Sequence, residues 1–149
     1  MTRAEHAAEL FANGYNCAQA VAMAFCDLTG FTKEQTAKML AAFGGGFGRL
    51  REVCGAVSGM TFVYGCLYGY EAPNPEAQMK VYETEQALAA QFRETAGSIV
   101  CRDILKNPPS DPVPNPRTEA YYAQRPCVRM VYLATSILDE YIAAHPIEQ

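Results

Sequence analysis

Apolar residues recur at helical spacing over most of this chain. Residues 75–96 show this most clearly, because Met79, Tyr82, Leu88 and Phe92 lie at helical intervals between charged positions. Apolar residues three or four apart share one face of a helix, so the segment predicts an amphipathic helix. Start and stop signals predict further helices over residues 3–12, 17–28, 33–43, 99–106, 119–124 and 127–144. No useful alternating strand pattern occurs, so the sequence predicts an all-α multi-helix bundle.

Residues 53–70 form an uncharged run of eighteen residues. This length is near the lower limit for a membrane span, but the run contains four glycines and three tyrosines. Gly55 and Gly59 lie one turn apart, as do Gly65 and Gly69. Such pairs let another backbone or a cofactor approach closely. We therefore expect a buried, glycine-rich central helix and no membrane span. A homodimer formed through the glycine face is an alternative role for this helix.

Length and composition fit one domain. The chain has 149 residues, half of them apolar, which is enough for one hydrophobic core. We therefore expect a single helical domain over residues 1–149. Residues 107–116 include five prolines, so a proline-rich loop is predicted within that domain at 106–117. The net charge of −4 and the lack of Lys/Arg clusters argue against a nucleic-acid partner.

The first ten residues carry acidic side chains and no apolar segment of the secretory kind. On this ground we expect a cytoplasmic protein, in which cysteines stay reduced. The six cysteines of the chain are then thiols, metal ligands or redox centres rather than structural disulfides.

Four of the six cysteines fall where a helix is predicted to begin: Cys17, Cys54, Cys101 and Cys127. The first of them directly follows Asn16, a residue type typical of N-caps. A helix start presents free N–H groups and a partial positive charge, and both favour a thiolate over a thiol. These four cysteines could converge at one end of a bundle, so they form one candidate site.

The predicted starts have separate signals. Ser98 is the candidate cap of the segment that contains Cys101, which is placed at its third position. Pro126 suits the first turn of the last helix, with Cys127 one residue further in. Cys54 is placed early in the central helix, after a glycine loop at residues 44–48.

The remaining cysteines, Cys26 and Cys66, are predicted to lie mid-helix in apolar surroundings, where a cysteine commonly serves as a small core residue. Cys17 and Cys26 are nine residues apart and would face opposite sides of an intact helix. Cys54 and Cys66 would be separated by roughly 18 Å along one helix. Neither pair is therefore expected to share a site.

Clustered thiolates leave several chemistries open. Two can cycle between dithiol and disulfide, and four can bind zinc or an iron–sulfur cluster. A cysteine nucleophile with a histidine base is disfavoured, because His6 and His145 lie near the chain ends. No C-x-x-C pair is present, which weakens the metal hypothesis. Four cysteines allow three pairings, and the sequence does not choose among them.

Glycines and arginines lie near the predicted cysteine site. The glycine loop lacks the strand and the Gly-Lys-Ser/Thr ending of a phosphate loop, so we expect a turn that permits close approach beside Cys54. The candidate cofactor-binding glycines are Gly44, Gly45, Gly46, Gly55 and Gly59. The candidate partners for a thiolate or an anionic ligand are Arg49, Arg51, Arg102, Arg125 and Arg129.

An ordered set of motifs carries a family resemblance. The motifs are Asn16-Cys17-Ala18-Gln19-Ala20-Val21, Gly44-Gly45-Gly46-Phe47-Gly48, Val53-Cys54-Gly55-Ala56-Val57-Ser58-Gly59, and the isolated Cys101 and Cys127. In this order they resemble the C_GCAxxG_C_C family of redox-active proteins over roughly residues 10–140. The Gly-Cys-Ala order of the family name stands here as Cys-Gly-Ala, and the role of its cysteine is carried to Cys54.

The resemblance implies a redox protein that uses Cys17, Cys54, Cys101 and Cys127. A related domain occurs in split-Soret cytochromes, but no C-x-x-C-H site for covalent haem is present here. Three hypotheses follow. In the first, Cys54 with one of Cys17, Cys101 or Cys127 forms a reversible disulfide or passes electrons to an unidentified redox partner. The others are zinc or iron–sulfur binding by the same four cysteines, and a non-catalytic helical dimerisation module.

Overall fold

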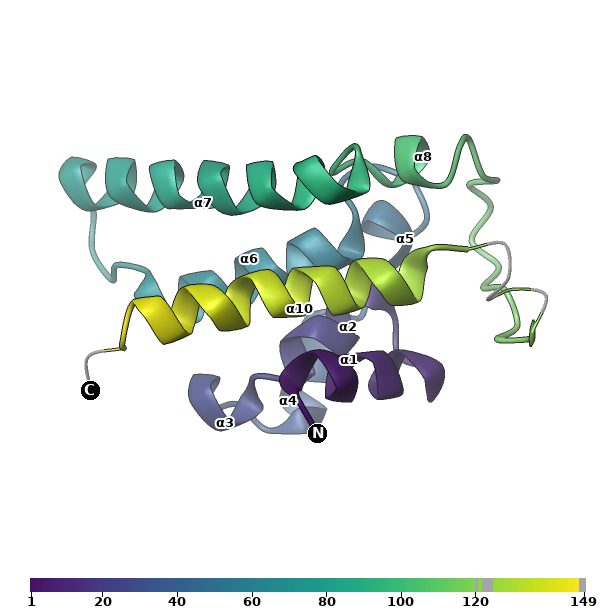
Figure 1. The fold of residues 1–149 in the computed structure, drawn as a ribbon, viewed down its shortest axis with the longest axis horizontal. Helices are drawn as coiled ribbons and strands as arrows, with labels where there is room; N and C mark the ends of the chain where they lie inside the picture. Colours follow the sequence, from purple (N-terminus) through teal and green to yellow (C-terminus); the bar gives the residue numbers. More distant parts are fainter. Residues whose placement is uncertain (120, 122–124, 148–149) are drawn as a thin grey trace.

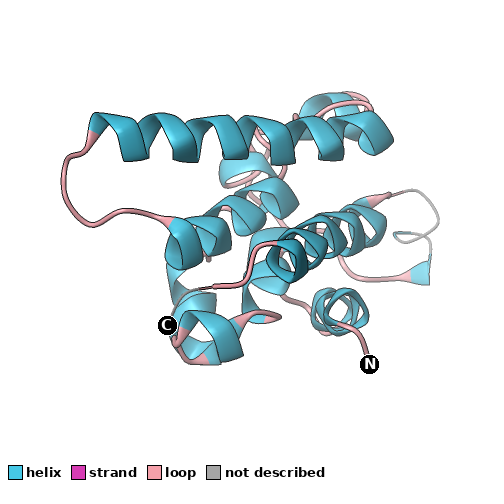
Figure 2. Cartoon of the chain, turned by 60° about the vertical axis from the view of Figure 1, so that its left-hand side comes forward, coloured by secondary structure: helices cyan, strands magenta, loops and turns pink. Residues whose placement is uncertain are grey.

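The computed structural model describes residues 1–119, 121 and 125–147, and it confirms the all-α fold. The described helices are α1 Arg3–Ala12, α2 Cys17–Met23, α3 Cys26–Thr29, α4 Lys33–Met39, α5 Gly44–Phe47, α6 Gly55–Tyr68, α7 Pro75–Ala96, α8 Cys101–Ile104 and α10 Cys127–Ala144. Helices make up the fold in Figure 2, and the extended pairing in the described ranges is an isolated bridge between Val53 and Val100.

Helix α6 lies inside the bundle, as its uncharged sequence predicts. Helix α10 runs beside it, α1 and α2 cover one side, and α7 lies on the other side (Figure 1). The starts of α6 and α10 lie at the same end of the molecule as the short helices α5 and α8 (Figure 1). This arrangement brings distant parts of the sequence together at one end of the bundle.

Local capping explains why several helices begin where the sequence predicts. The Asn16 side chain accepts from the Gln19 N–H, and the Gln19 side chain accepts from the Asn16 N–H. Thr32 and Gln35 form the same reciprocal capping box at α4. Two otherwise unpaired backbone donors are satisfied at each start. Both predicted helix starts are therefore confirmed.

The predicted helix over residues 17–28 is wrong in one respect, since it breaks into α2 and α3. Phe25 leaves the helical conformation at φ −113° and ψ 14°, and its side chain is fully buried. The Arg3 guanidinium donates to the Ala24 carbonyl at 2.8 Å and lies over the Phe25 ring. Burial of this ring and capture of the freed carbonyl explain the break, because both offset the lost helical hydrogen bonds.

Other predicted boundaries also shift. The helix predicted over residues 33–43 ends at Met39, and residues 40–42 form a turn. The central helix is shorter than residues 53–70, and the helix predicted at 99–106 shrinks to the single turn of α8. Residues 106–117 form no helix, as the prolines predict. The helix expected at 119–124 falls largely outside the described residues.

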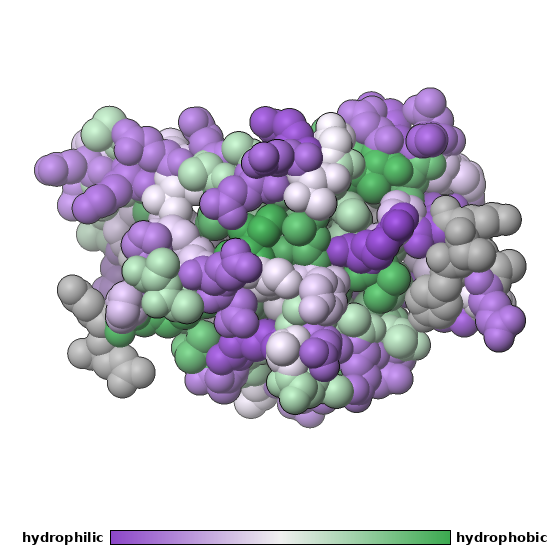
Figure 3. Space-filling view, in the orientation of Figure 1, coloured by the Kyte–Doolittle hydropathy of each residue, from purple (hydrophilic) through white to green (hydrophobic). Residues whose placement is uncertain are grey.

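The amphipathic helix over residues 75–96 is confirmed, but its buried face is narrower than predicted. Leu88 and Phe92 are buried, whereas Met79 and Tyr82 are more than half exposed. Hydrophilic side chains gather over this helix in Figure 3. In the part of the chain that the structure describes, no helix is long and apolar enough to cross a membrane.

Gly55 and Gly59 let α2 approach α6 closely, which is the backbone approach that their spacing predicts. A Cβ on Gly59 would lie 2.7 Å from the Ala18 carbonyl oxygen and 3.0 Å from the Val21 Cβ. A Cβ on Gly55 would lie 3.1 Å from the Cys17 Cβ. No such close approach occurs at Gly65, the first glycine of the Gly65/Gly69 pair, because a Cβ there would meet no atom within 4 Å. Close packing therefore explains the first glycine pair.

We predict opposite effects for alanine at these two kinds of glycine. Gly59→Ala should lower the free energy of unfolding by about 1–2 kcal/mol, because the new methyl group overlaps α2. Gly65→Ala should raise it by about 0.5–1 kcal/mol, since alanine favours the helix and the site is open. Urea denaturation of both variants checks this, and equal effects would contradict the close α2–α6 packing.

Candidate functional site

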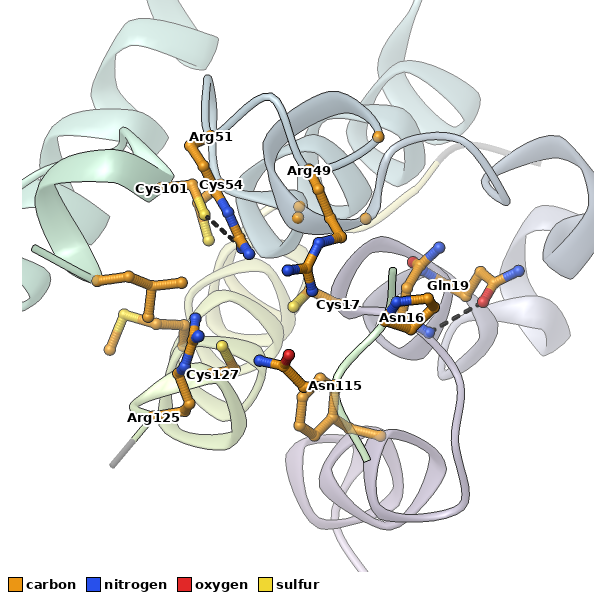
Figure 4. A pocket seen from close by; sticks show the side chains of 18 of the residues that line it. Asn16, Cys17, Gln19, Arg49, Arg51, Cys54, Cys101, Asn115, Arg125 and Cys127 are labelled. Atoms are coloured by element: carbon orange, nitrogen blue, oxygen red, sulfur yellow. Dashed lines mark hydrogen bonds between the residues drawn. The ribbon is translucent and has the colours of Figure 1, made fainter. Parts of the chain in front are cut away.

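The four cysteines predicted at helix starts line one cavity of about 440 Å³. Figure 4 shows Cys17, Cys54, Cys101 and Cys127 around this space, each from a different segment of the chain. The cavity lies where α2, α6, α8 and α10 begin. The structure therefore brings together the residues that the sequence grouped as one candidate site.

Each of these cysteines lies at a helix start, but three positions differ in detail from those predicted. Cys101 is the first residue of α8 rather than its third, because Val100 occupies the cap position. Cys127 is the first residue of α10, because Pro126 is its cap rather than its first helical residue. Cys54 is the cap of α6 and precedes the helix. Cys17 opens α2 as predicted.

A short stretch of paired backbone places Cys54 beside Cys101. The Cys54 N–H donates to the Ile99 carbonyl at 2.7 Å, and the Cys101 N–H donates to the Glu52 carbonyl at 2.6 Å. These two bonds flank the bridge between Val53 and Val100. Segments almost fifty residues apart in sequence are thus fixed to each other immediately before two helix starts.

Cys26 and Cys66 lie outside the cavity. The Cys26 Sγ lies 3.3 Å from the Thr36 Oγ1 in a partly buried position. Cys66 was predicted to be a core residue and is instead exposed. It follows Gly65 on α6, an exposed position where an added Cβ would meet no atom within 4 Å.

Cys127 and Cys17 lie on the same cavity wall and influence each other's ionisation. The neighbouring Cys17 thiol is the largest cause that lowers the pKa of Cys127, to about 6. Burial opposes this, while the Tyr121 hydroxyl and the charges of Arg125 and Arg117 lower the pKa of Cys127 further. The neighbouring Cys127 and burial raise the pKa of Cys17 well above its usual range. The pair therefore holds one proton readily and releases the other.

Cys54 and Cys101 are buried thiols. Burial raises the pKa of Cys54 to about 12, although the Ala56 and Val57 N–H groups act in the opposite direction. Burial also raises the pKa of Cys101, and the Arg51 guanidinium opposes it by donating to the Cys101 Sγ at 3.7 Å. Both are expected to stay protonated near neutral pH, in contrast to Cys127.

The glycines near the cavity serve different roles. Gly44 and Gly45 line it together with Gly55, whereas Gly46 and Gly59 are absent from its wall. A Cβ on Gly44 would overlap the Asn16 side chain, so this glycine lets the loop pack against the α2 cap. Close backbone packing therefore accounts for these glycines. Their assignment to cofactor binding remains a prediction.

Four thiols suit zinc or an iron–sulfur cluster by donor chemistry. The described residues, however, include no group of three or more Cys, His, Asp or Glu side chains close enough to hold one metal ion. Among the cavity thiols, Cys17 and Cys127 each act as the largest cause of the other's pKa shift. This mutual influence favours chemistry by a pair of sulfurs.

Arg117 and Tyr121 also line the cavity, although the sequence pattern did not point to either as a site residue. The Arg117 guanidinium lies 3.9 Å from the centre of the Phe11 ring and donates to the Tyr15 carbonyl at 3.2 Å. These contacts hold the end of the proline-rich segment against α1 and place a charge near Cys127. An arginine that ends a proline-rich segment, four residues before a tyrosine, was the available signal.

Fold and site define a helical protein with a cluster of cysteines at converging helix starts. The family model "Putative redox-active protein (C_GCAxxG_C_C)" matches residues 15–141, which is most of the chain. The chain therefore belongs to this family. No curated protein matches the chain, and no solved structure matches it.

Proposed function

We propose that this protein is a thiol oxidoreductase in which Cys127 is the attacking thiolate and Cys17 is the resolving thiol. The observation that carries the proposal is the placement of Cys17 and Cys127 at two helix starts on the wall of one cavity, where the pKa of Cys127 is lowered. A thiolate is the nucleophile in thiol–disulfide exchange, and helix starts with nearby cations stabilise it. The six free cysteines fit a reducing, cytoplasmic setting.

The reaction starts with attack of the Cys127 thiolate on one sulfur of a substrate disulfide. The substrate S–S bond breaks, and its second sulfur leaves with the electron pair as a thiolate. Cys17 then loses its proton to the medium, and its thiolate attacks the Cys127 sulfur. The bond between Cys127 and the first substrate sulfur breaks, that sulfur leaves with the electron pair and takes up a proton, and a Cys17–Cys127 disulfide remains. Two electrons pass from the protein to the substrate.

The opposite pKa shifts of the two thiols support both roles. The neighbouring Cys17 lowers the pKa of Cys127 and so favours its thiolate before attack, while Cys127 raises the pKa of Cys17 and keeps it protonated until Cys127 has reacted. Once Cys127 is in a mixed disulfide, Cys17 loses the neighbouring negative charge that raises its pKa. Cys17 then ionises more easily and becomes the better nucleophile.

The pH dependence of alkylation tests this proposal. With a pKa of about 6, the Cys127 thiolate falls less than twofold between pH 7 and pH 6. Cys66 has a pKa raised by burial, so its thiolate falls about tenfold over the same range. The alkylation rate of Cys127 divided by that of Cys66 should therefore rise about fivefold between pH 7 and pH 6. Peptide mass spectrometry after brief iodoacetamide treatment measures both rates in one sample.

Cys66 is the internal control, because it lies outside the cavity. A rate ratio that does not change between pH 7 and pH 6 would contradict an ionised Cys127. Protection of Cys17 and Cys127 that disappears only after a chelator is added would instead support metal ligation, and metal analysis of anaerobically purified protein would identify the metal.

A further inference from the structure

The cavity is cationic although the chain as a whole is acidic. Its described wall includes arginines but no Asp, Glu, Lys or His, whereas the chain has a net charge of −4. The four arginines are Arg49, Arg51, Arg117 and Arg125. Figure 4 shows Arg49, Arg51 and Arg125 directed towards the space that the thiols surround. Such a concentration of one charge favours ligands of the opposite charge.

Arg51 is the most deeply placed of these arginines, with 5% of its surface exposed. Its Nε donates to the Pro109 carbonyl at 2.9 Å, and its Nη1 donates to the Cys101 Sγ at 3.7 Å. Its Nη2 is buried and has no hydrogen-bond partner among the described residues. A buried donor of a charged group is normally paired, because an unpaired one is strongly destabilising.

The described residues offer Arg51 no counter-charge. Arg49 has a carboxylate partner, since its Nη2 lies 3.8 Å from the Asp111 Oδ2. No ion pair of this kind is found for Arg51 among the described residues. Cys101 supplies little negative charge, because burial raises its pKa. A guanidinium with a free edge and no neutralising partner fits a site completed by an anion.

The backbone holds Arg51 in place before any ligand binds. Its φ is +65°, in the left-handed region that side chains other than glycine rarely adopt. Its N–H donates to the Gly45 carbonyl at 3.1 Å, and its own carbonyl accepts from the Arg102 N–H at 3.0 Å. The surrounding loop thus fixes a strained conformation that directs the guanidinium into the bundle.

We propose that the cavity binds a small disulfide that carries a carboxylate or another oxyanion, with the Arg51 guanidinium as the anchor of that anionic group. This inference rests on the proposed function and names its substrate class. A guanidinium pairs with carboxylates and related oxyanions through two parallel N–H groups. The cavity volume of about 440 Å³ falls in the range of small-molecule pockets. Held at Arg51, the substrate presents its S–S bond to the thiols on the same wall.

Three disulfides of similar size and different charge test the proposal. They are the anionic dithiodiglycolate, the neutral hydroxyethyl disulfide and the cationic cystamine. Each disulfide is reacted with the Cys26→Ser/Cys66→Ser double variant, in which only the four cavity thiols remain. Each rate is divided by the rate at which the same disulfide reacts with a small free thiol in solution. We expect a normalised preference for dithiodiglycolate over the neutral disulfide of at least about tenfold, the effect of one charge-assisted hydrogen bond.

Arg51→Gln should remove most of this preference, and Arg102→Gln should leave it unchanged. Arg102 is the matched control because it lies outside the cavity wall and pairs with Glu52 at 3.1 Å on the surface. Raising the ionic strength should also reduce the preference in the parent protein. Equal normalised rates for the three disulfides in the parent protein would overturn the proposal.

A second measurement covers the case in which Arg51→Gln does not fold. Inorganic sulfate, added to the wild-type protein, should slow alkylation of Cys127 and leave Cys66 unaffected. No protection by sulfate at any concentration would overturn the anion site. Protection by sulfate together with no reaction at Cys127 by any disulfide would retain the anion site and reject the thiol oxidoreductase, so the two failures are distinguishable.

Discussion

Replacing Cys127 with serine is expected to abolish reversible disulfide formation in the cavity, which is the largest effect on activity that the structure predicts. Serine cannot form the mixed disulfide, and burial raises the pKa of each of the three remaining cavity thiols, Cys17, Cys54 and Cys101. Their thiolate fractions near neutral pH are therefore small. The measurement is the loss of two free thiols per chain when reduced protein is treated with a small disulfide.

Replacing Cys17 should produce a different defect. In Cys17→Ser the first step proceeds, but no resolving thiol follows, so the mixed disulfide with Cys127 should accumulate. Intact-protein mass spectrometry detects it as the added mass of half the substrate. Cys26→Ser is the matched control, because Cys26 lies outside the cavity. The assigned roles are wrong if Cys17→Ser loses two thiols as the wild type does.

The second large effect concerns Gly46, which supports the loop that carries Arg51. Gly46 has φ +72°, and a Cβ there would lie 2.6 Å from the Glu52 backbone nitrogen. Gly46→Ala combines an unfavourable left-handed alanine with a clash against backbone that pairs with α8. We expect the free energy of unfolding to fall by about 3 kcal/mol. Thermal denaturation should show a drop of roughly 10 °C.

Gly48 is the matched control for this substitution. It also has a left-handed φ, +59°, but a Cβ there would meet its nearest atom at 3.9 Å. Gly48→Ala should therefore lose only about 1 kcal/mol, from the backbone conformation alone. Equal losses in the two variants would mean that the Gly46 backbone contact does not constrain the loop.

Local signals in the sequence predicted much of this fold. Capping residues such as Asn16 and Thr32 act within three residues of themselves, so the starts of α2 and α4 could be located without a structure. The break at Phe25 could not, because it depends on burial of that ring and on Arg3, more than twenty residues away. The exposure of Cys66 also depends on which face of α6 is left uncovered.

In the candidate site, too, local signals predicted some features, whereas contacts between distant segments determined others. Helix-start signals grouped Cys17, Cys54, Cys101 and Cys127 correctly as neighbours of one cavity. Their different chemical states were not predictable, since these arise from burial and from contacts between distant segments. The positive φ values at Phe47, Arg49 and Arg51 were equally hidden, because they depend on backbone hydrogen bonds within the loop and, at Arg51, on one from the distant Arg102 N–H.

Peptide mapping of the disulfide formed by the wild-type protein tests the central claim most directly. Reduced protein is oxidised with a small disulfide, its remaining thiols are blocked with N-ethylmaleimide, and the protein is digested. The proposed attacking and resolving roles predict a peptide that joins Cys17 to Cys127 as the main product. A main product that joins Cys54 to Cys101, with Cys17 and Cys127 both recovered as blocked thiols, would contradict the account.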